Sequence, residues 1–223
     1  SAPARIDCCG GWSDTPPVSF EFGGSVACLA VLVDDKLPLR AQCRVSKEFQ
    51  GIILRTESRR LDNEALVASS KVKLTKVSDF CDFRDPTADA TLLKCVLIQL
   101  GFISAQSISK HNDATLQPHL ARFCQRQNED IGLEITSTSL LPTGSGMGSS
   151  SILAGCILAA VAKCVGIRLK GVEDDCTDNG NDSLIHSVLM VEQLLSTGGG
   201  WQDNIGGLVG GLKLGRSDAY VFP

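Results

Sequence analysis

The chain has 223 residues, 43% of them hydrophobic and 21% charged, and it carries a formal net charge of −4 at pH 7. That much apolar material can bury the core of one large domain, or of a domain with part of a second. The acidic balance leaves no electrostatic footprint for nucleic acid or for an anionic membrane, so we expect neither as a partner.

Strands are expected to dominate the first third of the chain. One should begin almost at the first residue, and apolar and β-branched residues between turn residues predict three more. These three strands are expected at 24–33, 39–45 and 51–57. Asp85 followed by Pro86 predicts the start of a helix that ends before Gly101. A further helix is expected over 116–127.

The second half alternates strand and helix around a glycine-rich loop. A strand at 132–137 leads into the loop, and the apolar segment 152–165 behind it predicts a long helix. The remaining elements are a polar, acidic connection, a helix and a closing strand, expected at 171–182, 183–196 and near 208–214. With strands early and helices packed on them later, the layout is α+β.

The loop itself has the composition of an anion-binding site. Positions 142–151 read Pro-Thr-Gly-Ser-Gly-Met-Gly-Ser-Ser-Ser. Glycines at alternate positions allow the positive φ angles that turn successive N–H groups toward one point, and they leave room for a phosphate. The helix behind the loop directs its unpaired N-terminal donors and its positive dipole end to the same place. The predicted cofactor-binding residues are Pro142, Gly144, Ser145, Gly146, Met147, Gly148, Ser149 and Ser150.

Spacing excludes the two commonest nucleotide motifs. No lysine follows the glycines, so the Walker pattern is absent, and G-x-G-x-x-G fails because Gly148 comes one position too early. A flexible Gly/Ser linker is the alternative, but a linker is not flanked by a strand and an apolar helix.

Two further motifs accompany the loop. Positions 3–17 read Pro-Ala-Arg-Ile-Asp-Cys-Cys-Gly-Gly-Trp-Ser-Asp-Thr-Pro-Pro, and Glu192 is followed by Gly-Gly-Gly-Trp-Gln-Asp-Asn at 198–204. Together with the loop, which matches P-x-G-x-G-[LM]-G-S-S, they resemble the GHMP small-molecule kinases over nearly the whole chain. The stretch Gly-Gly-Trp-Ser-Asp-Thr-Pro-Pro looks like the branch of fucokinases and heptose kinases, and most like the L-fucose kinases.

The resemblance implies catalytic and metal-binding roles at four positions. Asp203 falls at the family's catalytic aspartate, and Arg5 falls at an arginine beside the reacting hydroxyl. Ser150 and Glu192 fall at the hydroxyl and the carboxylate that bind Mg²⁺.

The resemblance also implies a sugar site at Gly11, Trp12 and Asp14. Asp14 would hold sugar hydroxyls, and Trp12 would offer an apolar face to the ring or its methyl group. Galactokinases carry Glu-His where this chain has Gly11-Trp12, which argues against galactose as the substrate. The alternative is that Trp12 caps the core and Asp14 belongs to a turn.

The residues around Glu192 and Asp203 support these roles but leave alternatives open. Glu192 lies in the apolar stripe of a helix between Ile185 and Leu195, where a carboxylate should be paired or ligate a metal. It could instead reach solvent, and Asp203 could be a turn residue among glycines. If Arg5 lies near Asp203, it should lower the pKa of that carboxyl. Asp203 would then accept the proton late or simply orient the hydroxyl.

As a whole, the resemblance implies a kinase that uses ATP and Mg²⁺ and phosphorylates the anomeric hydroxyl of L-fucose to give fucose 1-phosphate. A kinase for another sugar, such as a heptose phosphate, is an alternative. So is a lobe of a degenerate kinase that binds nucleotide or sugar without catalysis.

The resemblance further implies that residues 1–223 form the N-terminal, ATP- and sugar-binding lobe of a longer chain. Its fold should be a mixed sheet packed with helices, with the family's left-handed βαβ unit. A ferredoxin-like C-terminal lobe is expected to be missing, and the surface meant for it should favour self-association.

Compartment signals are few. The longest apolar run, 152–167, contains Lys163 and falls short of the roughly 20 residues that a membrane span requires. None of the ten cysteines forms a C-x-x-C pair, and no secretory signal is evident. We therefore expect a cytoplasmic protein with reduced thiols.

Overall fold

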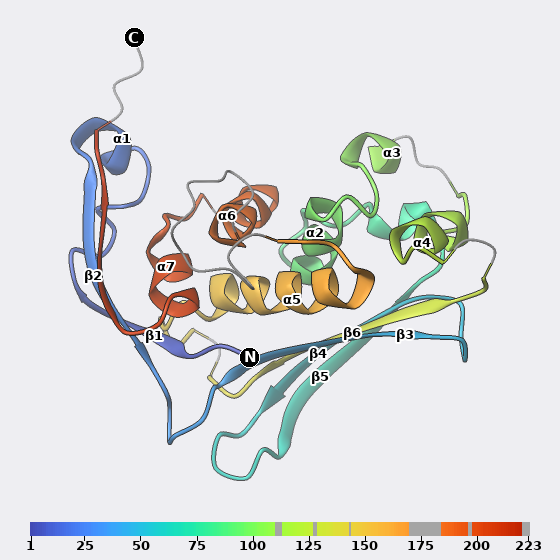
Figure 1. Ribbon diagram of the computed structural model, residues 1–223, viewed down its shortest axis with the longest axis horizontal. Coiled ribbons are helices and arrows are strands. Elements are labelled where there is room, and N and C mark those ends of the chain that lie inside the picture. Colours follow the sequence, from blue (N-terminus) through green and yellow to red (C-terminus); the bar gives the residue numbers. More distant parts are fainter. Residues whose placement is uncertain (110–112, 127–128, 143, 170–183, 196–197, 220–223) are drawn as a thin grey trace.

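Two β-sheets and a layer of helices make up the fold (Figure 1). The computed structural model describes residues 1–109, 113–126, 129–142, 144–169, 184–195 and 198–219. All helices except α1 lie over one face of the larger sheet, and the smaller sheet, with α1 at its tip, stands beside the end of that layer where α7 lies. This mixed α+β arrangement confirms the predicted fold class.

The larger sheet has four strands in the order β3-β6-β4-β5. They span Leu39–Ser46 (β3), Gly51–Arg59 (β4), Leu66–Leu74 (β5) and Gly132–Ser139 (β6). β4 and β6 run parallel, and the other neighbours are antiparallel, so the sheet is mixed. Alternation along β6 buries Leu133 and Ile135 against the helices. Glu134 between them accepts hydrogen bonds from Arg44 and Arg55 instead.

The smaller sheet joins the two ends of the described chain. Its strands span Ala4–Cys9 (β1), Gly24–Val31 (β2) and Leu212–Ser217 (β7), all antiparallel in the order β1-β2-β7. This pairing places the motif near the start of the chain beside the motif near its end.

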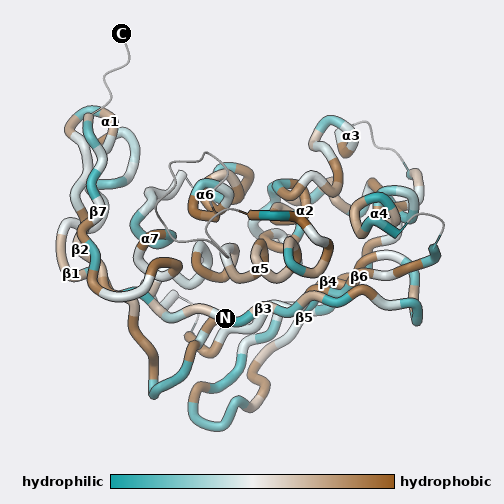
Figure 2. The backbone as a smooth tube through the Cα atoms, viewed as in Figure 1, coloured by the Kyte–Doolittle hydropathy of each residue, from teal (hydrophilic) through white to brown (hydrophobic). Residues whose placement is uncertain are grey.

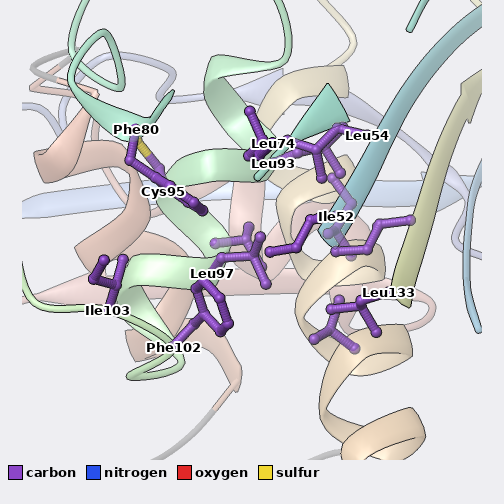
Figure 3. Packing of buried hydrophobic residues seen from close by; sticks show 14 of the residues in the cluster. Ile52, Leu54, Leu74, Phe80, Leu93, Cys95, Leu97, Phe102, Ile103 and Leu133 are labelled. Atoms are coloured by element: carbon purple, nitrogen blue, oxygen red, sulfur yellow. The ribbon is translucent and has the colours of Figure 1, made fainter. Parts of the chain in front are cut away.

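Helix α5 lies against β3 and is flanked by α2, α6 and α7. The helices span Val18–Phe22 (α1), Thr91–Gln99 (α2), Ala105–Ser109 (α3), Gln117–Phe123 (α4), Ser149–Val165 (α5), Leu184–Leu194 (α6) and Gln202–Leu208 (α7), with a 3₁₀ turn at Val77–Phe80. α2 and the strands beneath it are among the most apolar segments (Figure 2). Their side chains form the main core, where Leu93 and Leu97 of α2 lie near Ile52 and Leu54 of β4 (Figure 3).

Most predicted elements are confirmed, with ends that shift by a few residues. Four helices and strands are absent from the prediction, namely α1, β5, α3 and α7, as is the 3₁₀ turn at Val77–Phe80. The predicted helix 116–127 is the shorter α4, and position 127 lies outside the described residues, as does the connection 171–182.

The predicted helix start at Asp85-Pro86 is wrong. The Asp85 carboxylate accepts hydrogen bonds from the backbone N–H and the hydroxyl of Thr87, which forms a turn instead. α2 begins only at Thr91, after Ala90 in the left-handed conformation.

The predicted closing strand at 208–214 is displaced. Leu208 ends α7, where it packs against Gly155 of α5, and β7 begins at Leu212. Lys213 donates hydrogen bonds to the carbonyls of Gly206 and Val209, so it caps the C-terminal end of α7. Tertiary packing therefore decides where helix gives way to strand.

Across the described part of the chain, none of the helices has the length and apolar character that crossing a membrane demands.

Candidate functional site

The glycine-rich loop has the backbone conformation that the sequence predicts. Gly144, Gly146 and Gly148 have φ angles of 77°, 70° and 68°. α5 begins directly after Gly148, and no side chain caps its N-terminus. The first N–H groups of α5 therefore point out of the helix with its positive dipole end, an arrangement suited to a phosphate.

The loop residues differ in how far they reach into solvent. Exposed members are Pro142, Gly144, Ser145, Gly146 and Ser150, whereas Met147, Gly148 and Ser149 are half-buried. Position 143 lies outside the described residues. The Met147 carbonyl accepts a hydrogen bond from the Arg5 N–H at 3.4 Å, and its side chain packs in a small apolar cluster. Met147 therefore attaches the loop to β1.

Behind the loop lies an ion pair between the two predicted catalytic residues. Arg5 projects from β1 and is 6% exposed, and its Nη2 pairs with Oδ1 of Asp203 in the first turn of α7. A Cβ added at Gly148 would lie 3.0 Å from Cγ of Asp203 and 3.2 Å from Nε of Arg5. Loop, strand and helix thus meet at one point because Gly148 has no side chain.

The pKa of Asp203 is raised above its ordinary value, even though Arg5 lowers it as the sequence predicts. Burial of the carboxyl is the largest cause, and the negative charges of Asp14 and Asp7 add to it. Arg5 lowers the pKa, but it does not outweigh these effects. The carboxylate is therefore a better proton acceptor than the sequence suggested.

Glu192 is 9% exposed on α6, so it does not reach solvent. The hydroxyl that contacts it belongs to Ser151, which donates a hydrogen bond to Oε1, whereas Ser150 is exposed. Burial raises the pKa of Glu192, and the hydrogen bond from Ser151 opposes that rise. Helical spacing could have identified Ser151, because it shares the buried face of α5 with Gly155 and Leu158.

Asp14 is 1% exposed and lies at the start of α7, where its Oδ2 accepts a hydrogen bond from the Gln202 N–H at 2.7 Å. Its Oδ1 is buried without a hydrogen-bond partner among the described residues. Trp12 is 76% exposed, so it does not cap the core. Asp14 therefore holds the helix that carries Asp203.

Two residues beside Gly11, Asp7 and Gln202, were not predicted as site residues from the sequence. A Cβ at this position would overlap Oδ2 of Asp7 and would lie 3.4 Å from Oε1 of Gln202. The Asp7 carboxylate therefore depends on the space that Gly11 leaves, whereas Gln202 would be in ordinary contact with a side chain there.

Comparisons with known proteins find a family model that matches the second half of the chain. Residues 115–211 match the GHMP kinases N terminal domain, a stretch that includes the loop, Glu192 and Asp203.

Two curated proteins are similar along nearly the whole chain. The L-fucokinase/L-fucose-1-P guanylyltransferase of Bacteroides fragilis is 33% identical over 218 residues, 98% of this chain and 20% of its own length. The bifunctional fucokinase/GDP-fucose pyrophosphorylase of Arabidopsis thaliana is 31% identical over 215 residues, 96% of this chain and 16% of its own length. The chain thus spans a fifth or less of these relatives.

Solved structures show the same fold. A D-glycero-D-manno-heptose 1-phosphate kinase from Bacteroides thetaiotaomicron superposes with a TM-score of 0.55 at 22% identity, covering 96% of this chain and 54% of that one. The mevalonate kinase of Methanococcus jannaschii gives a TM-score of 0.54 at 14% identity, covering 96% and 52%. The chain therefore carries a GHMP kinase N-terminal domain, and its fold is the one that these kinases share.

Proposed function

We propose that this chain is the N-terminal lobe of a sugar kinase that transfers the γ-phosphoryl group of ATP to the anomeric hydroxyl of L-fucose. One observation carries the proposal: the anion-binding loop touches the Arg5–Asp203 pair at Gly148. Phosphoryl transfer requires a phosphate and a hydroxyl to be aligned beside groups that neutralise charge, and this contact would bring them together.

In this proposal the loop binds the nucleotide, and the Arg5–Asp203 pair acts on the sugar hydroxyl and the transferred phosphoryl group. Backbone N–H groups of the loop and of the first turn of α5 would hold the phosphates of ATP. The Asp203 carboxylate would orient the sugar hydroxyl and receive its proton, a role that its raised pKa favours. Two nitrogens of Arg5, Nε and Nη1, are buried without hydrogen-bond partners in the described part of the chain, so they could contact the transferred group.

Glu192 and a serine hydroxyl would form the protein's share of a Mg²⁺ site. Among the described residues no group of three or more His, Cys, Asp or Glu side chains could hold a metal. Mg²⁺ fits this limited donor set, because it binds phosphates through one or two protein oxygens and keeps several waters. When bound, it would neutralise charge on the phosphates. Ser150 remains our proposed ligand, and Ser151, already bonded to Glu192, is the alternative.

L-Fucose is proposed because both curated relatives are named as fucokinases and because of the Gly-Gly-Trp-Ser-Asp-Thr-Pro-Pro stretch. The free oxygen of Asp14 would accept a hydrogen bond from a sugar hydroxyl. The exposed face of Trp12 suits the methyl group of this sugar.

The test is ADP release by the full-length protein with ATP, Mg²⁺ and a panel of sugars. The panel should contain L-fucose, D-arabinose, which lacks the methyl group, D-galactose and a heptose phosphate. We expect L-fucose to give the highest kcat/KM, with fucose 1-phosphate as product. Binding of ATP with no sugar-dependent ADP release would favour the non-catalytic alternative, and preference for a heptose phosphate would replace L-fucose.

A further inference from the structure

Two polar side chains converge beside the proposed catalytic pair without a role in the reaction described so far. Asp7 reaches over Gly11 from β1, and Gln202 reaches the same point from the start of α7. A side chain at Gly11 would displace the Asp7 carboxylate and contact the Gln202 amide. The absence of a side chain at Gly11 therefore leaves room for the Asp7 carboxylate beside the Gln202 amide.

Both groups are placed by the elements that carry the catalytic pair. Asp7 follows Arg5 by two positions on β1, so the two side chains leave the strand on the same face. Gln202 immediately precedes Asp203 on α7. The charge of Asp7 also contributes to the raised pKa of Asp203, after burial and the charge of Asp14.

Their hydrogen-bonding capacity is unused in the described part of the chain. Oε1 of Gln202 is buried without a partner, whereas Asp7 is exposed and forms no salt bridge there, so its carboxylate is open to a ligand from solvent. Arg5, which is 6% exposed and lies two positions before Asp7 on β1, leaves Nε and Nη1 unpartnered. Buried polar atoms in proteins normally have partners, so this group of orphan atoms points to a ligand that supplies them.

We propose that Asp7 and Gln202 bind two neighbouring hydroxyls of the acceptor sugar and thereby determine which sugar is phosphorylated. The carboxylate accepts from one hydroxyl, and the amide can accept from or donate to the next. Vicinal hydroxyls of a sugar present donors and acceptors at the spacing that two adjacent side chains require. The inference rests on the proposed function, since it assigns the specificity of that same site.

The experiment compares wild-type and Asp7→Asn full-length protein with L-fucose and its 2-, 3- and 4-deoxy analogues. Losing a charge-assisted hydrogen bond is expected to raise the KM for L-fucose by about tenfold or more, with the KM for ATP unchanged. The deoxy analogue that lacks the hydroxyl bound by Asp7 should bind equally to both proteins, whereas the other analogues should keep the difference.

Two further variants keep the test independent of folding defects. Gly11→Ala should reproduce the rise in KM, because its methyl group displaces the Asp7 carboxylate. Asp35→Asn removes an exposed carboxylate in the turn between β2 and β3, so it serves as the matched control and should leave both KM values unchanged.

The outcomes separate this inference from the proposed function. Sugar turnover with an unaltered sugar KM in Asp7→Asn, or an equal loss with every analogue, would overturn the inference alone. If the wild-type protein phosphorylates no sugar, both the proposed function and the inference fail.

Discussion

The glycine-rich loop exposes Pro142 and residues 144–146 to solvent, whereas Arg5 and Asp203, which lie against Gly148, are charged and mostly shielded from it. We call Arg5, Asp14, Glu192 and Asp203 the buried charge cluster; three of them are less than 10% exposed, and the Asp203 side chain is 30% exposed. Unpaired backbone donors are tolerated at the exposed loop because solvent can reach them until a ligand binds. The cluster must instead hold charges in place before any ligand arrives, which costs stability.

This contrast predicts where substitutions act. Changes in the loop should alter nucleotide binding with modest effects on the fold, because few protein contacts depend on its exposed glycines. Changes in the cluster should affect turnover and stability together, because each side chain there also pairs with another element.

The largest effect is expected from Asp203→Asn. The substitution is nearly isosteric and removes the charge that orients or deprotonates the sugar hydroxyl, so turnover should fall by roughly 10²-fold or more. ATP affinity, measured by titration calorimetry, should stay nearly unchanged. In the wild-type protein kcat/KM should decline as pH falls through the raised pKa of Asp203. An Asn variant with turnover close to that of wild type would remove Asp203 from the mechanism.

Gly148→Ala and Gly146→Ala test the junction between loop and cluster. Both positions have positive φ, so each alanine should cost about 1–2 kcal/mol of conformational strain. A Cβ at Gly146 meets nothing within 4 Å, whereas one at Gly148 crowds Asp203 and Arg5. We expect turnover to fall about tenfold further in Gly148→Ala than in Gly146→Ala, by analogy with small misplacements of reacting groups. Equal turnover in the two variants would argue that the contact at Gly148 has no catalytic importance.

Asp14 combines a predicted sugar contact with a structural one. Asp14→Ala should raise the sugar KM at least tenfold and lower the free energy of unfolding by about 0.5–2 kcal/mol, because α7 loses the acceptor at its N-terminus. Asp14→Asn keeps an acceptor oxygen and should recover most of the stability but not the sugar KM. Chemical denaturation and steady-state kinetics separate the two effects, and a normal sugar KM in both variants would leave Asp14 a purely structural role.

Glu192→Gln should weaken Mg²⁺ binding but stabilise the ligand-free protein at neutral pH. We expect the Mg²⁺ concentration for half activity to rise several-fold, because an anionic ligand becomes neutral. Burial raises the pKa of Glu192, so the ionised side chain destabilises the folded protein as pH rises through that pKa. Without Mg²⁺ and ATP, the variant should therefore be more stable than wild type at neutral pH.

That advantage should disappear as pH falls below the ordinary carboxyl pKa near 4.5, where both side chains are neutral. Thermal unfolding at several pH values measures this difference in stability between the variant and wild type. A variant that is less stable than wild type at neutral pH would show that the charge of Glu192 stabilises the fold.

The smallest effects should come from the two serines that begin α5. Ser151→Ala removes the donor to Glu192 and should lower stability by about 1 kcal/mol. Ser150→Ala changes an exposed side chain and should alter stability by less than about 0.5 kcal/mol. The variant that raises the Mg²⁺ requirement identifies the metal ligand; if neither does, the proposed metal site is wrong.

Sequence reasoning was accurate where structure depends on local chemistry. The positive φ angles of the loop follow from its glycines, and α5 follows from its apolar run, because each depends on residues within a few positions. It failed at α2, where the Asp85 carboxylate bonds to Thr87 instead of starting a helix. It also failed for β7, whose start depends on how α7 packs. Cytoplasmic location, self-association and a single lobe over 1–223 stay predictions.

By itself, the sequence determined the three motifs, their order and the types of group they contribute. Only the tertiary structure decided which atoms meet: Ser151 instead of Ser150 at Glu192, and Asp14 at the start of α7. The tertiary structure was also needed to find that the pKa of Asp203 is raised. The reason is physical: burial, ion pairing and hydrogen bonding depend on distances between segments up to about 200 positions apart, such as Asp14 and Gln202, and only packing sets those distances.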